Sequence, residues 1–290
     1  MAETSTDGSS TVTRRQLSRL LRELRNETGR TMEEAAEELG ISVSSLSRIE
    51  LGKTSASPPV VRTMCQVYGR PDMVEGLLIL AKASKTKSWY HQYSDVIPDW
   101  FSSYIGLEQA AAQFRSYEAE LVPGIIQTAE YARTVIRNDH PTDSDEEVDR
   151  RVQLRMKRQA LLTRETNRQQ WHILIGEAIL WRPVGGSTAM KEQLQRLLEV
   201  SELPNVVLGV VPFGVGMHPG VTAGPFVLLD FPNPLDPTTV YVEGYTGALC
   251  TDDPAEVEKY RAAFEGIEKA ALNPADTRAL IARKAKEIES

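Results

Sequence analysis

The sequence predicts two domains: an all-α domain over residues 13–84 and an α+β domain over residues 85–290 whose sheet is mixed or antiparallel. Three observations lead to this prediction. Up to residue 84, apolar residues recur at helical spacing. Aromatic residues then crowd the segment after Trp89. Beyond residue 170, short runs rich in β-branched residues are separated by Gly/Pro turns, which is typical of strands. We expect residues 1–12 to be disordered.

The all-α domain is expected to contain five helices. The first runs from Thr13 to Asn26 and carries its leucines on one stripe. The fourth follows Ser57, because a serine cap and two prolines suit the first turn of a helix, and it ends at Gly69. The fifth runs from Pro71 to about Ser84.

Residues 31–54, TMEEAAEELGISVSSLSRIELGKT, supply the second and third helices. Thr31 and Ser42 have the chemistry of N-cap residues, and Gly40 can adopt the left-handed conformation that ends a helix. Within the third helix, Leu46 and Ile49 are spaced to point inward. Small polar side chains and one arginine are therefore left on its outer face, where they can approach the edges of bases in DNA.

This segment resembles the Xre, or lambda-repressor-like, helix-turn-helix family, through Ala35-Ala36 and the stretch SLSRIELGK, residues 45–53. The resemblance implies a reader of double-stranded DNA. It places base contacts at Val43, Ser44 and Arg48, and phosphate contacts at Thr31, Ser45, Lys53 and Thr54. Met32 departs from the family pattern, because a thioether cannot donate to a phosphate as the usual Gln does.

Two further pairs of residues extend this candidate site. Arg14 and Arg15 lie on the outer face expected for the first helix, so they are candidate phosphate contacts. Arg25 and Glu50 occupy positions that form a partly buried ion pair in relatives, and we expect them to be structural. Such readers commonly bind as two-fold dimers, so a homodimer on a palindromic operator is expected.

The second domain is expected to begin with helices and to continue with strands. We expect helices over residues 105–117, 127–138, 143–164, 188–202, 254–272 and 274–288. The runs that predict strands are WHILIGEAILW, VVLGVVPF, FVLLDF and TVYVEGYTGALC.

This second part is similar to a large domain of unassigned chemistry that follows an Xre-type reader in many actinomycete regulators and is classed as toxin-antitoxin-like. The resemblance implies a small partner protein encoded nearby, and a link to development and secondary metabolism. It is carried by the stretches HQYSDVIPDWF, YEAELVPGIIQTAEYAR, RRVQLRMKRQALLTR, EAILWRPVGG, GPFVLLDFP and VYVEGYTGALC.

The aromatic segment at the start of the second domain is a candidate pocket or interface. Aromatic side chains form apolar pockets, but they also dominate ordinary cores and dimer contacts, so both interpretations stay open. The residues concerned are Trp89, Tyr90, Tyr93, Trp100, Phe101 and Tyr104.

Net charge divides unequally along the chain. The whole sequence has 33 basic and 40 acidic residues, a net charge of −7; residues 1–87 carry 13 basic and 11 acidic, and the remainder carries 20 and 29. The acidic excess therefore belongs to the second domain. The weakly positive first domain should bind DNA outside its operator only modestly and in a salt-sensitive way.

Several classes of protein are not expected from this sequence. The four histidines, His91, His140, His172 and His218, lack a nucleophile or metal-ligand spacing, so we expect neither an enzyme nor a metal or other cofactor. Cys65 and Cys250 lie in apolar stretches and should be buried and reduced. The start of the chain lacks the features of a signal peptide, and no run is apolar enough for a membrane span. The protein is therefore expected in the cytoplasm.

Three functions fit these features. The first is a homodimeric, sequence-specific transcription regulator whose second domain receives a small protein partner. The second is an antitoxin that neutralises a small toxic partner and binds DNA to regulate itself. The third is a one-component sensor of a small molecule.

Overall fold

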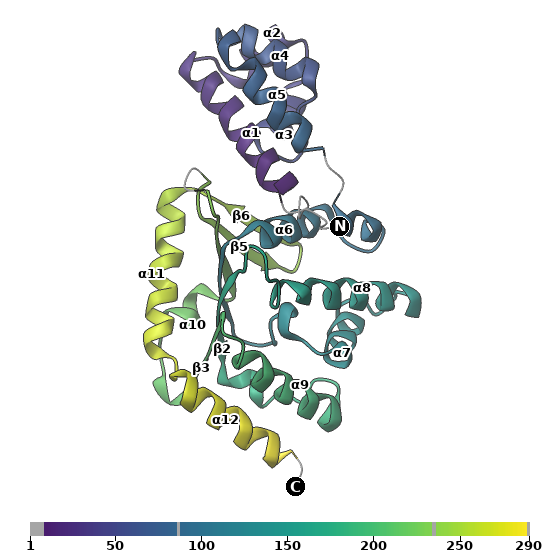
Figure 1. Ribbon diagram of the computed structural model, residues 1–290, viewed down its shortest axis with the longest axis vertical. Coiled ribbons are helices and arrows are strands. Elements are labelled where there is room, and N and C mark those ends of the chain that lie inside the picture. The colour runs from purple at the N-terminus through teal and green to yellow at the C-terminus, as the bar shows by residue number, and fades with distance from the viewer. Residues whose placement is uncertain (1–8, 86–87, 234–235, 289–290) are drawn as a thin grey trace. The chain divides into compact units, whose positions relative to one another are not determined.

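The computed structural model describes residues 9–85, 88–233 and 236–288, which fold into two compact units (Figure 1). The first unit comprises the described residues up to His91 together with residues 105–110. The second comprises residues 92–104 and the described residues from Ala111 onward. The division therefore falls later than the boundary that the sequence predicts at residue 85. Each unit has its own apolar core.

The first unit consists of helices around one core. Its elements are α1 (Ser9–Glu27), α2 (Met32–Leu39), α3 (Val43–Glu50), α4 (Pro58–Val67), the 3-10 turn η1 (Pro71–Met73), α5 (Val74–Ala83), part of the 3-10 turn η2 (Trp89–Tyr93) and residues 105–110 of α6 (Asp99–Ala110). The leucines of α1 pack with Leu46, Ile49 and Met64 in this core. The helical spacing in the sequence correctly predicts these contacts.

Helix α1 begins earlier than the sequence predicts. Residues 9–12 are helical, so the prediction of a disordered segment up to residue 12 is wrong for them, and residues 1–8 lie outside the described part of the chain. Ser10 and Thr11 are buried, and their hydroxyls lie 3.1 Å from the hydroxyls of Ser88 and Tyr90, respectively. These partners are far away in the sequence, so no local pattern could reveal them.

The second unit is built on a six-stranded mixed sheet, which confirms one of the two predicted sheet types. Its order is β3-β2-β1-β4-β5-β6, with β1, β2 and β3 parallel and the other neighbours antiparallel. The strands are β1 (Gln113–Glu118), β2 (Gln170–Gly176), β3 (Val206–Val211), β4 (Phe226–Asp230), β5 (Thr239–Gly244) and β6 (Gly247–Thr251).

Strand β1 corrects the helix predicted over residues 105–117. The helix there is α6 (Asp99–Ala110), and the chain then extends into β1, where Phe114 aligns with Trp171 of β2. β2 and β4 pair with the two edges of β1, and helices cover both faces of the sheet (Figure 1), so the sequence of β1 shows no clean alternation. The partly helical spacing of its apolar residues was therefore misleading.

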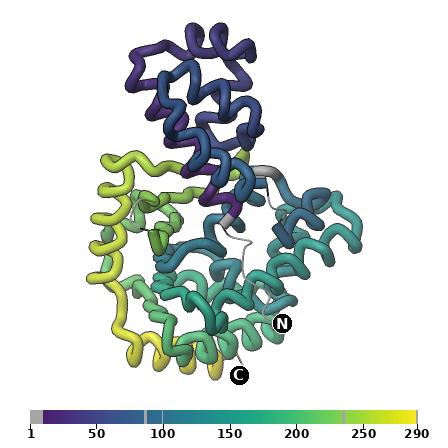
Figure 2. The backbone as a smooth tube through the Cα atoms, turned by 45° about the horizontal axis from the view of Figure 1, so that its top comes forward, coloured from purple at the N-terminus to yellow at the C-terminus, as the bar shows by residue number. Residues whose placement is uncertain are grey.

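Helices cover both faces of the sheet, with α11 on one face and α7, α8 and α9 on the other (Figure 1). Figure 2 shows α11 and α12 following one another along the second unit. Phe264 of α11 packs in one core with Phe226 and Leu228 of β4. The helical elements are η3 (Gly124–Ile126), α7 (Ala129–Asp139), α8 (Asp145–Arg158), η4 (Gln159–Leu161), η5 (Glu177–Leu180), α9 (Gly186–Ser201), η6 (Phe213–Val215), α10 (Pro219–Ala223), α11 (Pro254–Ala270) and α12 (Pro274–Glu287).

Two predicted runs divide into more than one element. The run WHILIGEAILW is β2 followed by η5, and TVYVEGYTGALC is the hairpin of β5 and β6. The helix predicted over residues 143–164 is α8, which ends at Arg158. Cys65 is buried, but Cys250 is exposed, which corrects the expectation that both are buried. Cys250 lies on β6, the last strand of the sheet, where the cover is incomplete.

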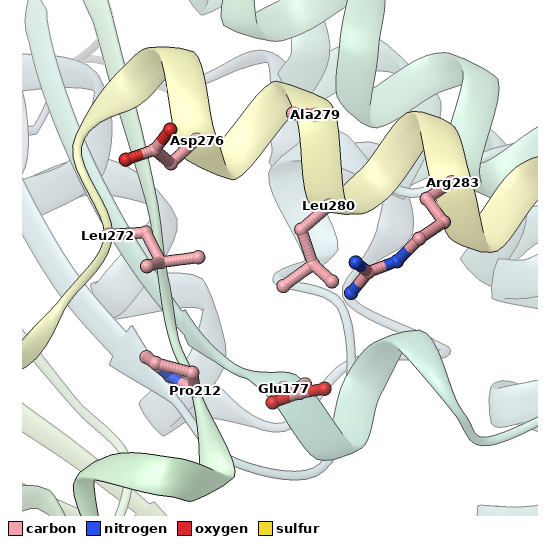
Figure 3. A pocket seen from close by; sticks show the side chains of 7 residues that line it. All are labelled: Glu177, Pro212, Leu272, Asp276, Ala279, Leu280 and Arg283. Atoms are coloured by element: carbon pink, nitrogen blue, oxygen red, sulfur yellow. The ribbon is translucent and has the colours of Figure 1, made fainter.

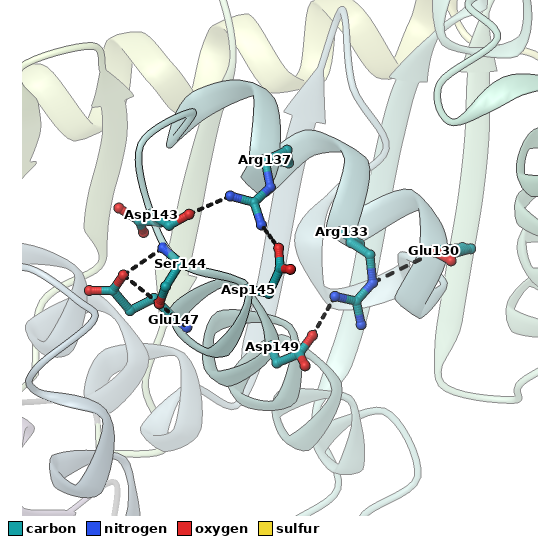
Figure 4. Close-up of polar contacts among 8 residues, drawn as sticks. All are labelled: Glu130, Arg133, Arg137, Asp143, Ser144, Asp145, Glu147 and Asp149. Atoms are coloured by element: carbon teal, nitrogen blue, oxygen red, sulfur yellow. Dashed lines mark hydrogen bonds and ion pairs between the residues drawn. The ribbon is translucent and has the colours of Figure 1, made fainter.

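Ion pairs join helices α7 and α8 (Figure 4). Arg133 of α7 pairs with Asp149 of α8, and Arg137 pairs with Asp145 at the start of α8. Ser144 and Glu147 form a capping box there, with the Ser144 N–H donating to Glu147 Oε2 at 2.7 Å. The box satisfies backbone donors that would otherwise lack partners at the start of a helix.

Candidate DNA-reading surface

Helices α2 and α3 are joined by a tight turn at Gly40. Gly40 has φ of +66°, a left-handed conformation that costs glycine little, and the Ile41 N–H donates to Ala36 O at 3.0 Å. The Ser42 side chain then accepts from the Ser45 N–H at 3.1 Å and caps α3. The two helices and their turn thus follow the arrangement that the sequence predicts.

The outer face of α3 presents the three predicted base contacts. Val43, Ser44 and Arg48 are all exposed, whereas Leu46 and Ile49 are buried on the opposite face. Ser44 and Arg48 are four residues apart, so they are neighbours on the helix surface. Within the described residues, Arg48 forms no ion pair, and its guanidinium is therefore available to an external acceptor.

Three predicted phosphate contacts gather beyond the end of α3. Gly52 has φ of +68°, and the N–H groups of Lys53 and Thr54 donate to Arg48 O at 2.9 and 3.1 Å. A Cβ on Gly52 would lie 3.5 Å from Arg15 Cγ, so Arg15 of α1 lies beside this turn. Lys53 and Thr54 are exposed. This geometry brings two cations and a hydroxyl to the edge of the surface formed by α3.

Thr31 and Ser45 use their hydroxyls within the protein. Thr31 Oγ1 accepts from the Glu34 N–H, and the Glu34 carboxylate accepts from the Thr31 N–H at 2.9 Å. This backbone hydrogen bond lowers the pKa of Glu34 and keeps a negative charge at the start of α2. Ser45 Oγ lies 2.8 Å from Ser42 Oγ. Both residues are thus less suited to bind phosphate than Lys53.

Arg14 differs from the other candidate phosphate contacts because it is partly buried. Its Nε atom is buried and has no hydrogen-bond partner among the described residues. Burial lowers the pKa of its guanidinium. We therefore keep Arg15, and not Arg14, in the candidate DNA-reading surface.

Arg25 and Glu50 fix α3 in place. Arg25 donates from Nε and Nη2 to the two carboxylate oxygens of Glu50 at 2.8 and 2.9 Å, and from Nη1 to Arg30 O at 2.8 Å. The hydrogen bonds that Arg25 donates to the Glu50 carboxylate raise the pKa of Arg25. A single guanidinium thereby links α1, the end of α3 and the segment that precedes α2.

The predicted aromatic residues divide between the two units. Tyr90, Tyr93 and Tyr104 are buried, whereas Trp89, Trp100 and Phe101 are half-buried. In the first unit, Tyr90 is buried, and Trp89 meets it edge-on with ring centroids 5.8 Å apart. In the second unit, Phe101 stacks on Tyr104, and Tyr104 stacks on Tyr241 at 4.2 Å.

Arginine side chains lie over two of these aromatic rings in the second unit. Arg158 lies over Phe101 at 5.2 Å from the ring centroid, and Arg150 lies over Tyr93 at 5.4 Å. Trp100 meets Phe101 edge-on. The cationic partners come from α8, so the sequence around the aromatic residues could not reveal them.

A pocket lies elsewhere in the second unit, between α12 and the ends of β2 and β3 (Figure 3). Its volume is about 340 Å³, and Figure 3 shows Arg283 extending from α12 toward Glu177. Its lining combines apolar and charged side chains from separate segments, which is why no sequence motif marked it. The lining residues are Glu177, Pro212, Leu272, Asp276, Ala279, Leu280 and Arg283.

Exposed apolar side chains follow β2 and β3 near this pocket. The Glu177 carboxylate joins the two loops, because it accepts from Trp181 Nε1 at 3.2 Å and from the Phe213 N–H at 2.9 Å. We call the exposed set in these loops and in α10 the apolar surface; it comprises Trp181, Phe213, Val215, Met217 and Val221. Exposed apolar residues that gather in this way are typical of interaction sites.

Two of the histidines, His218 and His172, pack against neighbours in the second unit. His218 Nδ1 accepts from the Gly220 N–H at 3.2 Å and caps α10, and burial lowers the pKa of His172. Among residues 9–85, 88–233 and 236–288, no group of three or more potential ligands is arranged to hold a metal ion. No helix in these ranges is long and apolar enough to cross a membrane.

Comparison with protein families finds two matches. The family described as Domain of unknown function (DUF5753) matches residues 101–283. The family described as Helix-turn-helix domain matches residues 16–75, which contain α2, α3 and the turn between them. No curated protein and no solved structure matches the chain.

Proposed function

The chain belongs to the family defined by the Domain of unknown function (DUF5753), and we propose that this member is a sequence-specific transcription regulator that binds a palindromic operator as a homodimer. Its helix-turn-helix domain indicates a DNA-binding regulator. We assign that domain to the Xre type, and the chain to an actinomycete, on the resemblance of SLSRIELGK and of the second domain.

The exposed Arg48 carries this proposal. It projects from the outer face of α3 without an ion pair in the described chain, and Ser44 lies next to it. An arginine so placed can donate two hydrogen bonds to guanine O6 and N7 in the major groove. The serine hydroxyls discriminate poorly between bases, so Arg48 is expected to dominate the choice of sequence. Arg15, Lys53 and Thr54 would hold the adjacent phosphates.

Two recognition helices are needed for a long, specific operator. A two-fold dimer would place its two α3 helices in major grooves about 34 Å apart, so the two half-sites should be inverted repeats one helical turn apart. Each half-site contributes only the few contacts that α3 and its flanking turn can make. Dimerisation therefore supplies much of the affinity for the operator.

The test begins with selection of bound fragments from the source genome, followed by titration of the recovered operator. We expect Arg48→Ala to weaken operator binding by about 1 to 3 kcal/mol and to relax the preference at one base pair. Arg62→Ala, which removes an exposed arginine from α4, is the matched control and should bind as the unchanged protein does. Full, selective binding by the Arg48→Ala protein would refute the assignment.

We also propose that the second unit receives a small protein encoded nearby. The apolar surface supports this role, since Phe213 and Met217 are large, apolar and exposed in the segment between β3 and α10. A protein with both Phe213→Ser and Met217→Ser should no longer bind the partner protein but should still bind the operator. The matched control is Ile79→Ser, which replaces an exposed apolar residue of the first unit. Retained partner binding by the double variant would rule out this surface.

The same surface would serve an antitoxin, and growth assays separate the two functions. Expression of the partner alone should arrest growth if the partner is toxic, and co-expression should relieve the arrest. The sensor hypothesis draws support from the pocket beside Glu177 and Arg283, whose volume suits a small ligand. A ligand in that pocket should raise the melting temperature, and Arg283→Ala should remove the rise.

A further inference from the structure

The two edges of the sheet in the second unit differ in their cover. At one edge, the chain around α12 closes on β3: the Leu272 N–H donates to Val210 O at 2.8 Å, and the Val210 N–H donates to Thr277 Oγ1 at 3.1 Å. At the other edge, β6 pairs with β5 and ends the order of strands within the described residues.

Strand β6 lacks the features that keep an edge strand from pairing. Its sequence, Gly247-Ala248-Leu249-Cys250-Thr251, contains no charged residue and no proline. Edge strands of soluble proteins usually carry charges, prolines or bulges that prevent association. Instead, the Leu249 side chain is 48% exposed, and Tyr245 in the adjoining turn is 99% exposed. An apolar, uncharged edge of this kind is suited to accept another strand.

We propose that β6 pairs with β6 of a second copy in antiparallel orientation, so that the two sheets become one continuous sheet across a two-fold axis. The inference rests on the homodimer of the proposed function and names its surface. Antiparallel pairing of identical strands is self-complementary, as a two-fold interface requires. A second copy fits the charge pattern, because an uncharged edge lets two acidic chains meet without direct repulsion.

The register of the hairpin determines how the two copies align. In β5 and β6, Gly244 aligns with Gly247 across a two-residue turn, and Val242 aligns with Leu249. Hydrogen-bonded pairs alternate along such a hairpin, so the backbone of Leu249 faces β5 and that of Ala248 faces outward. Pairing all five residues of β6 with their copies centres the axis on Leu249. Leu249 then lies opposite its own copy in a non-hydrogen-bonded pair, with Cα atoms about 4.5 Å apart.

A disulfide tests this alignment in the full-length protein. We expect Leu249→Cys, in a Cys250→Ser background, to form a disulfide-linked dimer on mild oxidation, because about 4.5 Å lies within the Cα separation of disulfides. Val207→Cys in the same background is the matched control, since Val207 is 45% exposed on β3, the opposite edge strand. Cys65 is fully buried and should not react. Equal crosslinking of both variants would overturn the proposed pairing.

A second pair of variants tests the same interface through the dimer dissociation constant, without a crosslinking reaction. Leu249→Lys would set two ammonium groups against each other across the axis, so the dimer dissociation constant should rise at least about tenfold in sedimentation equilibrium. Val207→Lys should leave it unchanged. If the unaltered protein sediments as a monomer and binds its operator as one, the proposed homodimer itself fails. If the dimer persists but Leu249→Cys and Leu249→Lys have no effect, dimerisation stands and its assignment to β6 is wrong.

Discussion

Replacing Arg25 with Met removes the cation that holds Glu50 at the end of α3. Arg25 and Glu50 share two hydrogen bonds, and their side chains are 11% and 2% exposed. The methionine side chain is long enough to fill part of the space but cannot donate. Glu50 is then left as a charge without a partner in the core of the first unit.

The expected loss follows from this burial. Removing one partner of a fully buried ion pair costs about 3 to 5 kcal/mol. Because the Arg25 side chain retains some exposure, we expect a loss of about 2 to 3 kcal/mol. The control is Arg30→Met, which breaks the pair between Arg30 and Glu38 on the surface, with exposures of 29% and 46%. That pair should contribute much less, because water screens it.

Hydrogen exchange of the intact protein, followed by mass spectrometry of peptides from α1 and α3, measures the loss within the first unit. In the Arg25→Met protein, the opening free energy of these peptides should fall, whereas peptides from β2 and β3 should be unchanged. A joint Arg25→Met, Glu50→Met replacement should restore most of the loss, since neither charge remains. The reasoning is refuted if the Arg25→Met and Arg30→Met proteins show the same opening free energies in the α1 and α3 peptides.

Three further changes have defined outcomes. Burial, and to a lesser extent the negative charge of Glu243, raises the pKa of Glu118 to about 8. A carboxyl group whose pKa is raised on folding stabilises the folded state at low pH, and this stabilisation is lost as the pH rises through 8. Glu118→Gln should therefore stabilise the protein at pH 9 but not at pH 4 in urea titrations. Lys53→Ala should reduce the salt slope of operator binding by about 1 without changing base preference, as measured by binding at several salt concentrations. Gly52→Ala should lower stability by about 1 kcal/mol in the same urea titrations, because φ there is +68°, a conformation that residues with a Cβ rarely adopt.

Local chemistry explains why the helix-turn-helix was predictable. The caps Thr31 and Ser42, the turn glycine Gly40 and the inward Leu46 all act within a few residues of one another. Their geometry can therefore be derived from sequence spacing alone. The partial burial of Arg14, by contrast, depends on its tertiary surroundings and could not be derived in this way.

The second domain was less predictable because its decisive contacts are distant in sequence. Tyr104 stacks on Tyr241, and the Asn205 amide donates to Leu162 O and Gln169 O. Strand β1 is defined by pairing with strands that come much later in the chain. The pocket and the apolar surface likewise draw on separate loops, so neither produces a motif.

The shared carboxylate of Glu177 makes Trp181 a natural optical probe. The Trp181 indole N–H and the Phe213 backbone N–H donate to the two carboxylate oxygens of Glu177. Displacement of the loop after β2 or the loop after β3 therefore changes the surroundings of the indole. Trp181 is exposed, whereas Trp171 is buried. Occupation of the neighbouring surface should therefore appear as a shift in tryptophan emission, and the protein can report its own binding events without any attached dye.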